Sequence, residues 1–101
     1  MDVIALPIEG IVSNPDVRGG KPIIDGTGLR VMDVAARVRF HQETPEQIAE
    51  GFQITMAQVH AALAYYFAHQ AAIDRELDDE TALIEDAKEK GVGQRRPPLF
   101  R

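Results

Sequence analysis

Two helix-start signals lie close together in the middle of the chain, and they constrain the fold more than any other feature. Thr44-Pro45-Glu46-Gln47 has a threonine that caps a helix, a proline at the first helical position and a glutamine that completes a capping box. Thr55-Met56-Ala57-Gln58 repeats the box a few residues later. Because the first helix has to end near Gly51 or Phe52, the sequence predicts two helices joined by a short turn. This is the pattern of a helix-turn-helix.

The segments on either side of this pair are also predicted to be helical. Val31, Val34, Ala35 and Val38 recur at the spacing of one helix face, which predicts a helix over about 32–40. After Thr55, neither glycine nor proline interrupts the chain before residue 91. One helix of that length is unusual in so small a domain. We therefore expect a break where capping residues cluster, near Asp74 or Asp78.

Residues 1–31 have a different character, because they hold most of the glycines and half of the prolines. The pattern predicts short strands separated by turns. The β-prone pieces are Val3 to Leu6, Ile11–Val12, Ile23–Ile24 and Leu29–Val31. An isolated hairpin is only marginally stable in water, so this element has to dock on the helices or pair with another chain.

The length of 101 residues predicts one domain, which we place at residues 1–90. It consists of a turn-rich β arm (1–31), a tri-helical core (32–73) and a helical extension (74–90). Residues 91–101 are expected to form a flexible tail. The predicted fold class is therefore mainly α, with a short N-terminal β element and a long C-terminal helix.

The net charge of −5 argues against a general nucleic-acid binder, whose affinity comes largely from neutralising phosphates. The chain has no cysteine, which excludes disulfides and suits a reducing, cytoplasmic environment. The first residues lack the basic and apolar regions of a signal peptide. No stretch has the roughly 18 apolar residues of a membrane span, so no membrane association is expected.

The reactive side chains form no catalytic pattern. Ser13 lies before a turn and lacks a nucleophile motif. His60 and His69 are nine positions apart on a helix, so they lie on opposite faces and cannot share a metal ion. The acidic residues near the end of the last helix alternate with lysines and fit a solvated face. We expect no catalytic residue, no cofactor and no metal site, and therefore no enzyme.

A DNA-binding interpretation remains open as an alternative. The helix that begins at Thr55 would enter the major groove, where the Gln58 amide can recognise adenine. Residues 42–68 contain neither lysine nor arginine, which weakens this interpretation. The candidate DNA-binding residues are Arg18, Lys21, Arg30, Arg37, Arg39 and Gln58.

Two segments are candidates for binding a protein partner. Residues 61–68 are apolar nearly all round, so either the arm and the second helix cover them or a partner does. Residues 95–101 are basic and then apolar, which suits a segment that becomes ordered on a partner. The candidate partner-binding residues are Tyr65, Tyr66, Phe67, Arg95, Arg96, Leu99, Phe100 and Arg101.

The glycine-rich arm carries a resemblance to a known family. Residues 14–24, Asn-Pro-Asp-Val-Arg-Gly-Gly-Lys-Pro-Ile-Ile, are followed by Gly26-Thr27, and Thr44 to Ile48 and Ala61 to Tyr66 extend the match. This pattern resembles the bacterial domain of unknown function 433. The motif that defines the backbone shape is Gly19, Gly20, Lys21, Pro22, Gly26 and Thr27. The family usually continues with arginine, a branched residue and proline, where this chain has Gly28, Leu29 and Arg30.

The resemblance implies a homeodomain-like, tri-helical fold and an antitoxin role. Members are commonly paired with a small nuclease toxin that resembles the PIN fold. We therefore expect an antitoxin-like module in the cytoplasm that binds such a toxin. Separately, the β element at residues 3–12 or the helix around Ile73 to Ala87 could join two copies into a homodimer, and DNA-binding autoregulation is a candidate second activity. The alternatives are a helix-turn-helix transcriptional regulator and, with the least support from the residues, a small enzyme.

Overall fold

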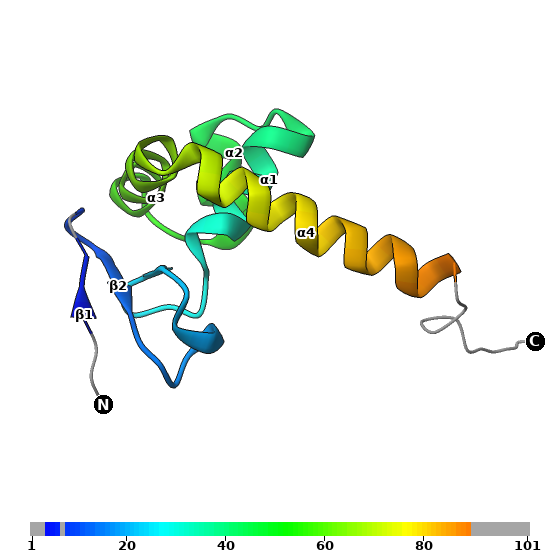
Figure 1. Cartoon of the computed structure of the whole chain (residues 1–101). Coiled ribbons are helices and arrows are strands. Elements are labelled where there is room, and N and C mark those ends of the chain that lie inside the picture. The colour runs from blue at the N-terminus through cyan, green and yellow to red at the C-terminus, as the bar shows by residue number, and fades with distance from the viewer. Residues whose placement is uncertain (1–3, 7, 90–101) are drawn as a thin grey trace, which may run out of the picture.

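The computed structural model describes residues 4–6 and 8–89, and over these residues the chain is mainly helical (Figure 1). A short sheet comes first and four helices follow. The strands are β1 (Ile4–Ala5), β2 (Ile11–Ser13) and β3 (Ile23–Ile24), and the helices are α1 (Val31–His41), α2 (Pro45–Phe52), α3 (Met56–Ala68) and α4 (Gln70–Glu89). The predicted class is confirmed: mainly α, with an N-terminal β element and a long last helix.

The starts of α2 and α3 are the two capping boxes found in the sequence. The Thr44 hydroxyl accepts from the Gln47 backbone N–H at 3.2 Å, and the Gln47 carboxamide oxygen accepts from the Thr44 N–H at 2.8 Å. Thr55 and Gln58 form the same reciprocal pair at 3.1 and 2.8 Å. Each cap satisfies backbone donors that the first helical turn leaves unpaired. These local hydrogen bonds explain why both helix starts are readable from sequence.

The strands form one antiparallel sheet in the order β1-β2-β3. Ile4 and Ala5 lie opposite Ser13 and Val12, while Ile11 and Val12 lie opposite Ile24 and Ile23. The sheet docks on the helices, because the Ile11 and Ile24 side chains are both 1% exposed within the core.

The glycine-rich motif defines the shape of the turns around this sheet. Gly19 and Gly20 have φ values of 69° and 81°, a region that glycine enters without steric cost. The Ser13 hydroxyl donates to the Gly20 carbonyl at 2.6 Å and holds this turn against β2. The Thr27 hydroxyl donates to the Ile24 carbonyl at 2.8 Å and accepts from the Leu29 N–H at 3.0 Å. The motif therefore has a structural role in the described chain.

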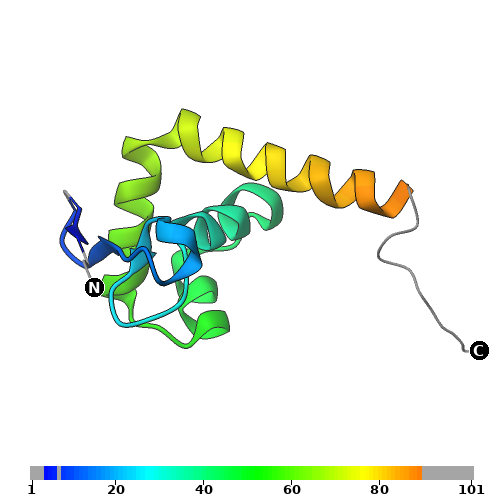
Figure 2. The same ribbon diagram turned by 60° about the horizontal axis from the view of Figure 1, so that its bottom comes forward.

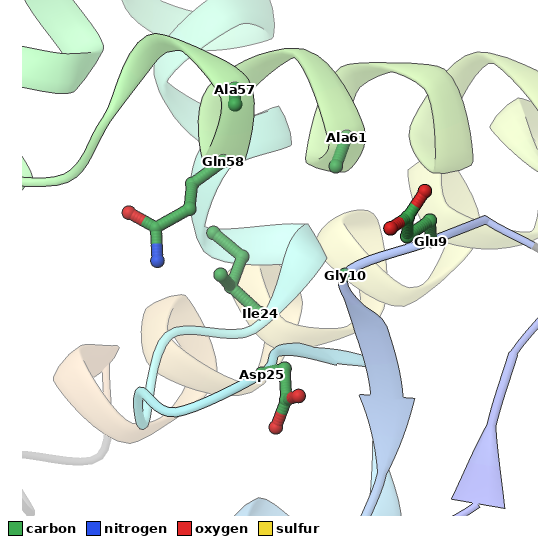
Figure 3. Close-up of a pocket in the computed structure, with 7 residues that line it drawn as sticks. All are labelled: Glu9, Gly10, Ile24, Asp25, Ala57, Gln58 and Ala61. Atoms are coloured by element: carbon green, nitrogen blue, oxygen red, sulfur yellow. The ribbon is translucent and has the colours of Figure 1, made fainter.

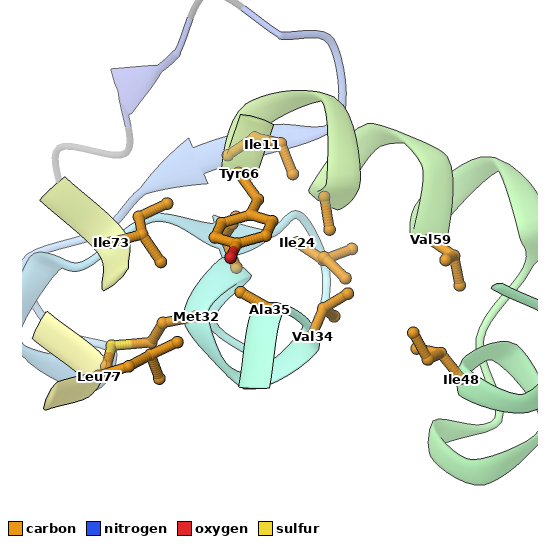
Figure 4. Close-up of a cluster of buried hydrophobic side chains, with 12 residues drawn as sticks. Ile11, Ile24, Met32, Val34, Ala35, Ile48, Val59, Tyr66, Ile73 and Leu77 are labelled. Atoms are coloured by element: carbon orange, nitrogen blue, oxygen red, sulfur yellow. The ribbon is translucent and has the colours of Figure 1, made fainter. Parts of the chain in front are cut away.

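One apolar core joins the sheet to all four helices (Figure 4). Its helical part centres on α1 and α3, where Val34 and Val59 are fully buried. Burial of one such side chain contributes about 1.5–3 kcal/mol. The cluster consists of Ile11, Ile24, Val31, Met32, Val34, Ala35, Ile48, Val59, Ala62, Tyr66, Ile73 and Leu77.

The break in the long helical region corrects the sequence prediction. It occurs at His69 (φ −128°, ψ 35°), not near Asp74 or Asp78, which both lie inside α4. The His69 ring stacks on Tyr65 with 4.2 Å between the ring centroids. The bend brings Ile73 and Leu77 onto the core, where they are 5% and 3% exposed. Tertiary burial therefore determined the position of the break, and the capping residues did not.

After this bend, α4 runs antiparallel to α1 and continues past it (Figures 1 and 2). Arg39, near the end of α1, pairs with Asp74 and Asp78, whereas Arg30, just before α1, pairs with Glu80. The residues after Glu80 therefore extend beyond the first turn of α1. Within the described part of the chain, no helix is both long enough and apolar enough to cross a membrane.

Candidate functional site

The basic side chains proposed for DNA binding are engaged with carboxylates of the same chain. Arg30 is the most enclosed, with its side chain 13% exposed. It contacts Asp33 at 2.8 Å and Glu80 at 3.3 Å. The hydrogen bond with Asp33 raises the pKa of Arg30, the charges of Asp33 and Glu80 raise it further, and burial opposes them. Asp33 also accepts from the Arg30 backbone N–H at 2.8 Å, so this pair begins α1.

Two further cations tie α4 to the rest of the molecule. Arg39 contacts the Asp78 carboxylate at 3.0 Å and donates to the Asp74 carbonyl at 3.1 Å. Its hydrogen bond with Asp78 raises the pKa of Arg39. Lys21, in the turn before β3, lies 3.3 Å from Glu76. Together with Arg30, these residues hold the first half of α4 in register against α1.

The remaining two arginines have partners nearer in sequence. Arg18 donates to the Gly28 carbonyl at 3.0 Å and lies 3.7 Å from Asp33. Arg37 Nη1 donates to both carboxylate oxygens of Glu43, at 2.8 and 3.0 Å, and the Arg37 guanidinium lies over the Phe52 ring. A phosphate would therefore have to compete with an internal carboxylate for all five of these cations.

Gln58 lines an open hollow of about 460 Å³ between α3 and the turns beside the sheet (Figure 3). Two carboxylates, Glu9 and Asp25, stand at its edge, and Ile24 contributes an apolar wall. The Gln58 carboxamide oxygen already caps Thr55, so only its amide group is available to bind adenine. Negative charge at the edge opposes phosphate binding. The lining residues are Glu9, Gly10, Ile24, Asp25, Ala57, Gln58 and Ala61.

The predicted aromatic anchors divide between the core and the surface. Tyr66 is 2% exposed, and its hydroxyl donates to the Asp74 carboxylate at 2.7 Å, so it is a core residue and not a surface anchor. Tyr65 is half-buried under the His69 ring. Phe67 is 57% exposed at the end of α3. Arg95, Arg96, Leu99, Phe100 and Arg101 lie outside the described residues.

The candidate partner-binding residues chosen from sequence did not include Leu83 and Ile84, which form an apolar surface on α4. Leu83 is 71% exposed and Ile84 is 54% exposed. Beside Leu83, a shallow hollow of about 240 Å³ is lined by Lys21, Met32, Glu76, Asp79, Glu80 and Leu83. A signal was present, because Ile84 and Ala87 continue the helical stripe of Ile73 and Leu77. That α1 begins at Val31 and does not extend beneath the later part of this stripe could not be read from sequence.

The described residues include no group of three or more histidine, aspartate or glutamate side chains arranged to hold a metal ion. What the surface does contain is exposed apolar side chains next to carboxylates. Such a surface suits binding to another macromolecule through burial of apolar area, with charge guiding the approach.

Comparison with known proteins finds one family and one related structure. A family model described as "Protein of unknown function (DUF433)" matches residues 11–66, from β2 into α3. The crystal structure of Rv2018 from Mycobacterium tuberculosis resembles this chain with a TM-score of 0.53 and 34% sequence identity. The likeness covers 60% of this chain and 29% of that one, so the match spans less than a third of Rv2018. No curated protein matches the sequence. α4 lies beyond the family match.

Proposed function

The chain belongs to the DUF433 family of proteins of unknown function, and we propose that it is an antitoxin-like module that neutralises a small nuclease toxin. The toxin class comes from the family resemblance, which implies a nuclease similar to the PIN fold. In this proposal the chain acts by binding and covering its partner. We also propose that the chain forms a homodimer and is located in the cytoplasm.

The observation that carries this proposal is the exposure of large apolar side chains on two helices. Phe67, Leu83 and Ile84 are each more than half exposed. Phenylalanine is enriched at protein interfaces, and an apolar pair on a helix end provides buried area to a partner. A domain of this size buries only about two-thirds of its unfolded surface, so added burial in a complex would stabilise it.

The mode of inhibition proposed from the sequence uses residues 91–101. Nucleases of this class hold Mg²⁺ with clustered carboxylates. Arg95, Arg96 and Arg101 would take the place of the cation, with Leu99 and Phe100 packed beside them. Deletion of residues 91–101 tests this part alone, and undiminished inhibition by the shortened chain would exclude it.

The proposed function is tested with the product of the adjacent reading frame. We expect that protein to arrest growth when expressed alone and to be neutralised when this chain is co-expressed. The two proteins should also purify as one complex, and the complex should cleave RNA far more slowly than the partner alone. A partner that neither binds this chain nor loses activity in its presence would refute the proposal.

DNA binding is the second candidate, and the capped pair α2–α3 favours it. We propose that α1, α2 and α3 form the homeodomain-like helix-turn-helix implied by the family, with α3 as the recognition helix. His60 is exposed on α3, and Gln58 lies in its first turn. The internal ion pairs of the basic residues oppose this role. A gel shift on the gene's own promoter at several salt concentrations tests it, and no shift by the dimer or by the toxin complex would exclude it.

A further inference from the structure

The outer half of α4, residues 79–89, continues the face with which the inner half packs on the core. Eleven residues make just over three full turns of a helix, so Ile84 lies nearly in line with Ile73. Ile73 and Leu77 are buried, whereas Ile84 is 54% exposed. The difference arises because α1 begins at Val31 and does not extend beneath the end of α4. Residues 81–89 span roughly 13 Å along the helix axis beyond the Arg30–Glu80 ion pair.

The base of this outer half contains a hollow suited to a cationic side chain. Met32, only 5% exposed, and Leu83 form its apolar part. Glu76, Asp79 and Glu80 place three carboxylates around it. Glu76 is paired with Lys21 and Glu80 with the Arg30 guanidinium, whereas Asp79 has no ion pair among the described residues. An arginine or lysine has an apolar stem and a charged end, so both parts of such a side chain find complementary surroundings here.

We propose that residues 79–89 and this hollow form a docking surface, the outer α4 surface, for an apolar groove edged with arginine or lysine on a protein partner. Leu83 and Ile84 would enter the groove, and the carboxylates of α4 would pair with the cations at its edges. One cationic side chain of the partner would occupy the hollow beside Met32.

Charge selects this occupant over a second copy of the chain. The outer half has one lysine, Lys88, against five acidic residues, Asp79, Glu80, Glu85, Asp86 and Glu89. Two such helices placed side by side would bring like charges together. The same charge repels nucleic-acid phosphates. A basic protein surface gains from both the apolar pair and the charge.

The inference rests on the proposed function in one respect, which is the identity of the partner. A nuclease must expose lysine or arginine to hold the phosphates of its RNA. An acidic helix with an apolar edge would bind that same surface and compete with RNA for it. The inference thus assigns the contact to a segment that lies outside the family match.

The test measures binding of the adjacent reading frame's product to two double variants. We expect Leu83→Ala with Ile84→Ala to weaken binding on the order of 30-fold or more, since central apolar anchors dominate interface affinity. Asp79→Lys with Glu85→Lys should weaken it about tenfold at low salt and less at high salt. The matched controls are Met56→Ala, an exposed apolar residue on α3, and Glu50→Lys, an exposed acid on α2, and both should bind within about twofold of the natural chain.

Each outcome separates the inference from the proposed function. Binding that both double variants retain in full would overturn the inference and leave the antitoxin proposal standing. If the adjacent product does not bind at all, the antitoxin proposal fails. A synthetic amphipathic peptide of leucine and arginine then tests the surface by NMR. Peptide-induced shifts that cluster at residues 76–87 would support the outer α4 surface, and shifts elsewhere or none would overturn it.

Two further measurements test whether a second copy of the chain, or its own residues 91–101, covers the outer α4 surface instead. Sedimentation of the natural chain and of the Leu83→Ala, Ile84→Ala variant should show the same oligomeric state. Loss of self-association in the variant would overturn the inference, because a second copy would then cover the surface. Deletion of residues 91–101 should leave peptide affinity within about threefold. A tenfold gain would overturn the inference, because the chain's own terminal residues would then be the occupant.

Discussion

Tyr66 provides the sharpest test of how the α3–α4 joint is held. Its ring lies in the core, and its hydroxyl donates to Asp74 Oδ1 at 2.7 Å across the bend at His69. Tyr66→Phe keeps the ring and removes the hydroxyl with its hydrogen bonds to Asp74 and to the Gln70 side chain. Because the bond to Asp74 joins α3 to α4, its loss should lower the free energy of unfolding. The orientation of α4 relative to α3 should also become less fixed.

The structure indicates the size of the effect. A hydrogen bond to a charged group contributes about 1.5–3 kcal/mol. The Asp74 side chain is 28% exposed and also lies 3.8 Å from Arg39, so the carboxylate would keep water and a cation after the substitution. We therefore expect a loss near the lower limit, about 1.5 kcal/mol. For a domain of this size that corresponds to a decrease in Tm of about 6–12 °C.

The assay is thermal and urea unfolding of the two proteins followed by circular dichroism. Tyr65→Phe is the matched control, because no hydrogen bond of the Tyr65 hydroxyl is found among the described residues and its ring keeps the stacking on His69. We expect that control to differ from the natural chain by less than about 0.5 kcal/mol. Equal stability of Tyr66→Phe and the natural chain would refute the reasoning about the joint.

Three further outcomes follow from the same contacts. Burial and the hydrogen bond with Asp74 raise the pKa of Tyr66. The contribution of the neutral Tyr66 hydroxyl to stability should therefore be complete below about pH 10 and lost as the pH rises through the folded-state pKa. Absorbance titration at alkaline pH and unfolding of Tyr66→Phe check this. Ile48→Ala should cost about 2–5 kcal/mol because Ile48 is fully buried, whereas Ile84→Ala should change stability by less than about 0.5 kcal/mol, both measured by urea unfolding. Thr55→Ala should cost about 1 kcal/mol through the lost cap of α3, and Thr55→Ser should restore most of it; a serine variant as unstable as the alanine variant would contradict the capping argument.

The parts of the fold that sequence predicted correctly depend on contacts between near neighbours. The two threonine caps act over three residues, and the strands at Ile11 and Ile23 lie between turn signals that are equally local. The glycines of the motif define backbone shapes by their own φ angles. Local chemistry of this kind is visible in the order of residues.

The parts that sequence missed depend on residues far apart along the chain. Capping propensity at Asp74 suggested a helix break, but the Asp74 carboxylate accepts from Tyr66 inside the fold. The partner of Lys21 could not be read from sequence either, because Glu76 lies 55 positions later. Partners at such distances are decided by packing, which the sequence pattern does not reveal.

The exposed stripe on α4 shows the same limit at the candidate site. The periodicity of Ile73, Leu77 and Ile84 predicts one continuous apolar face. Only the fold shows that α1 covers the first two residues and leaves Ile84 exposed. The sequence alone therefore could not separate exposed from buried residues of this face, because that depends on how far α1 extends along α4.

Hydrogen exchange of this chain, alone and mixed with the adjacent reading frame's product, tests the central claim most directly. The account predicts a complex in which amide exchange slows across residues 79–89 of the outer α4 surface, while the two caps at Thr44 and Thr55 exchange as before. Exchange that is identical with and without that product throughout residues 79–89 would contradict it.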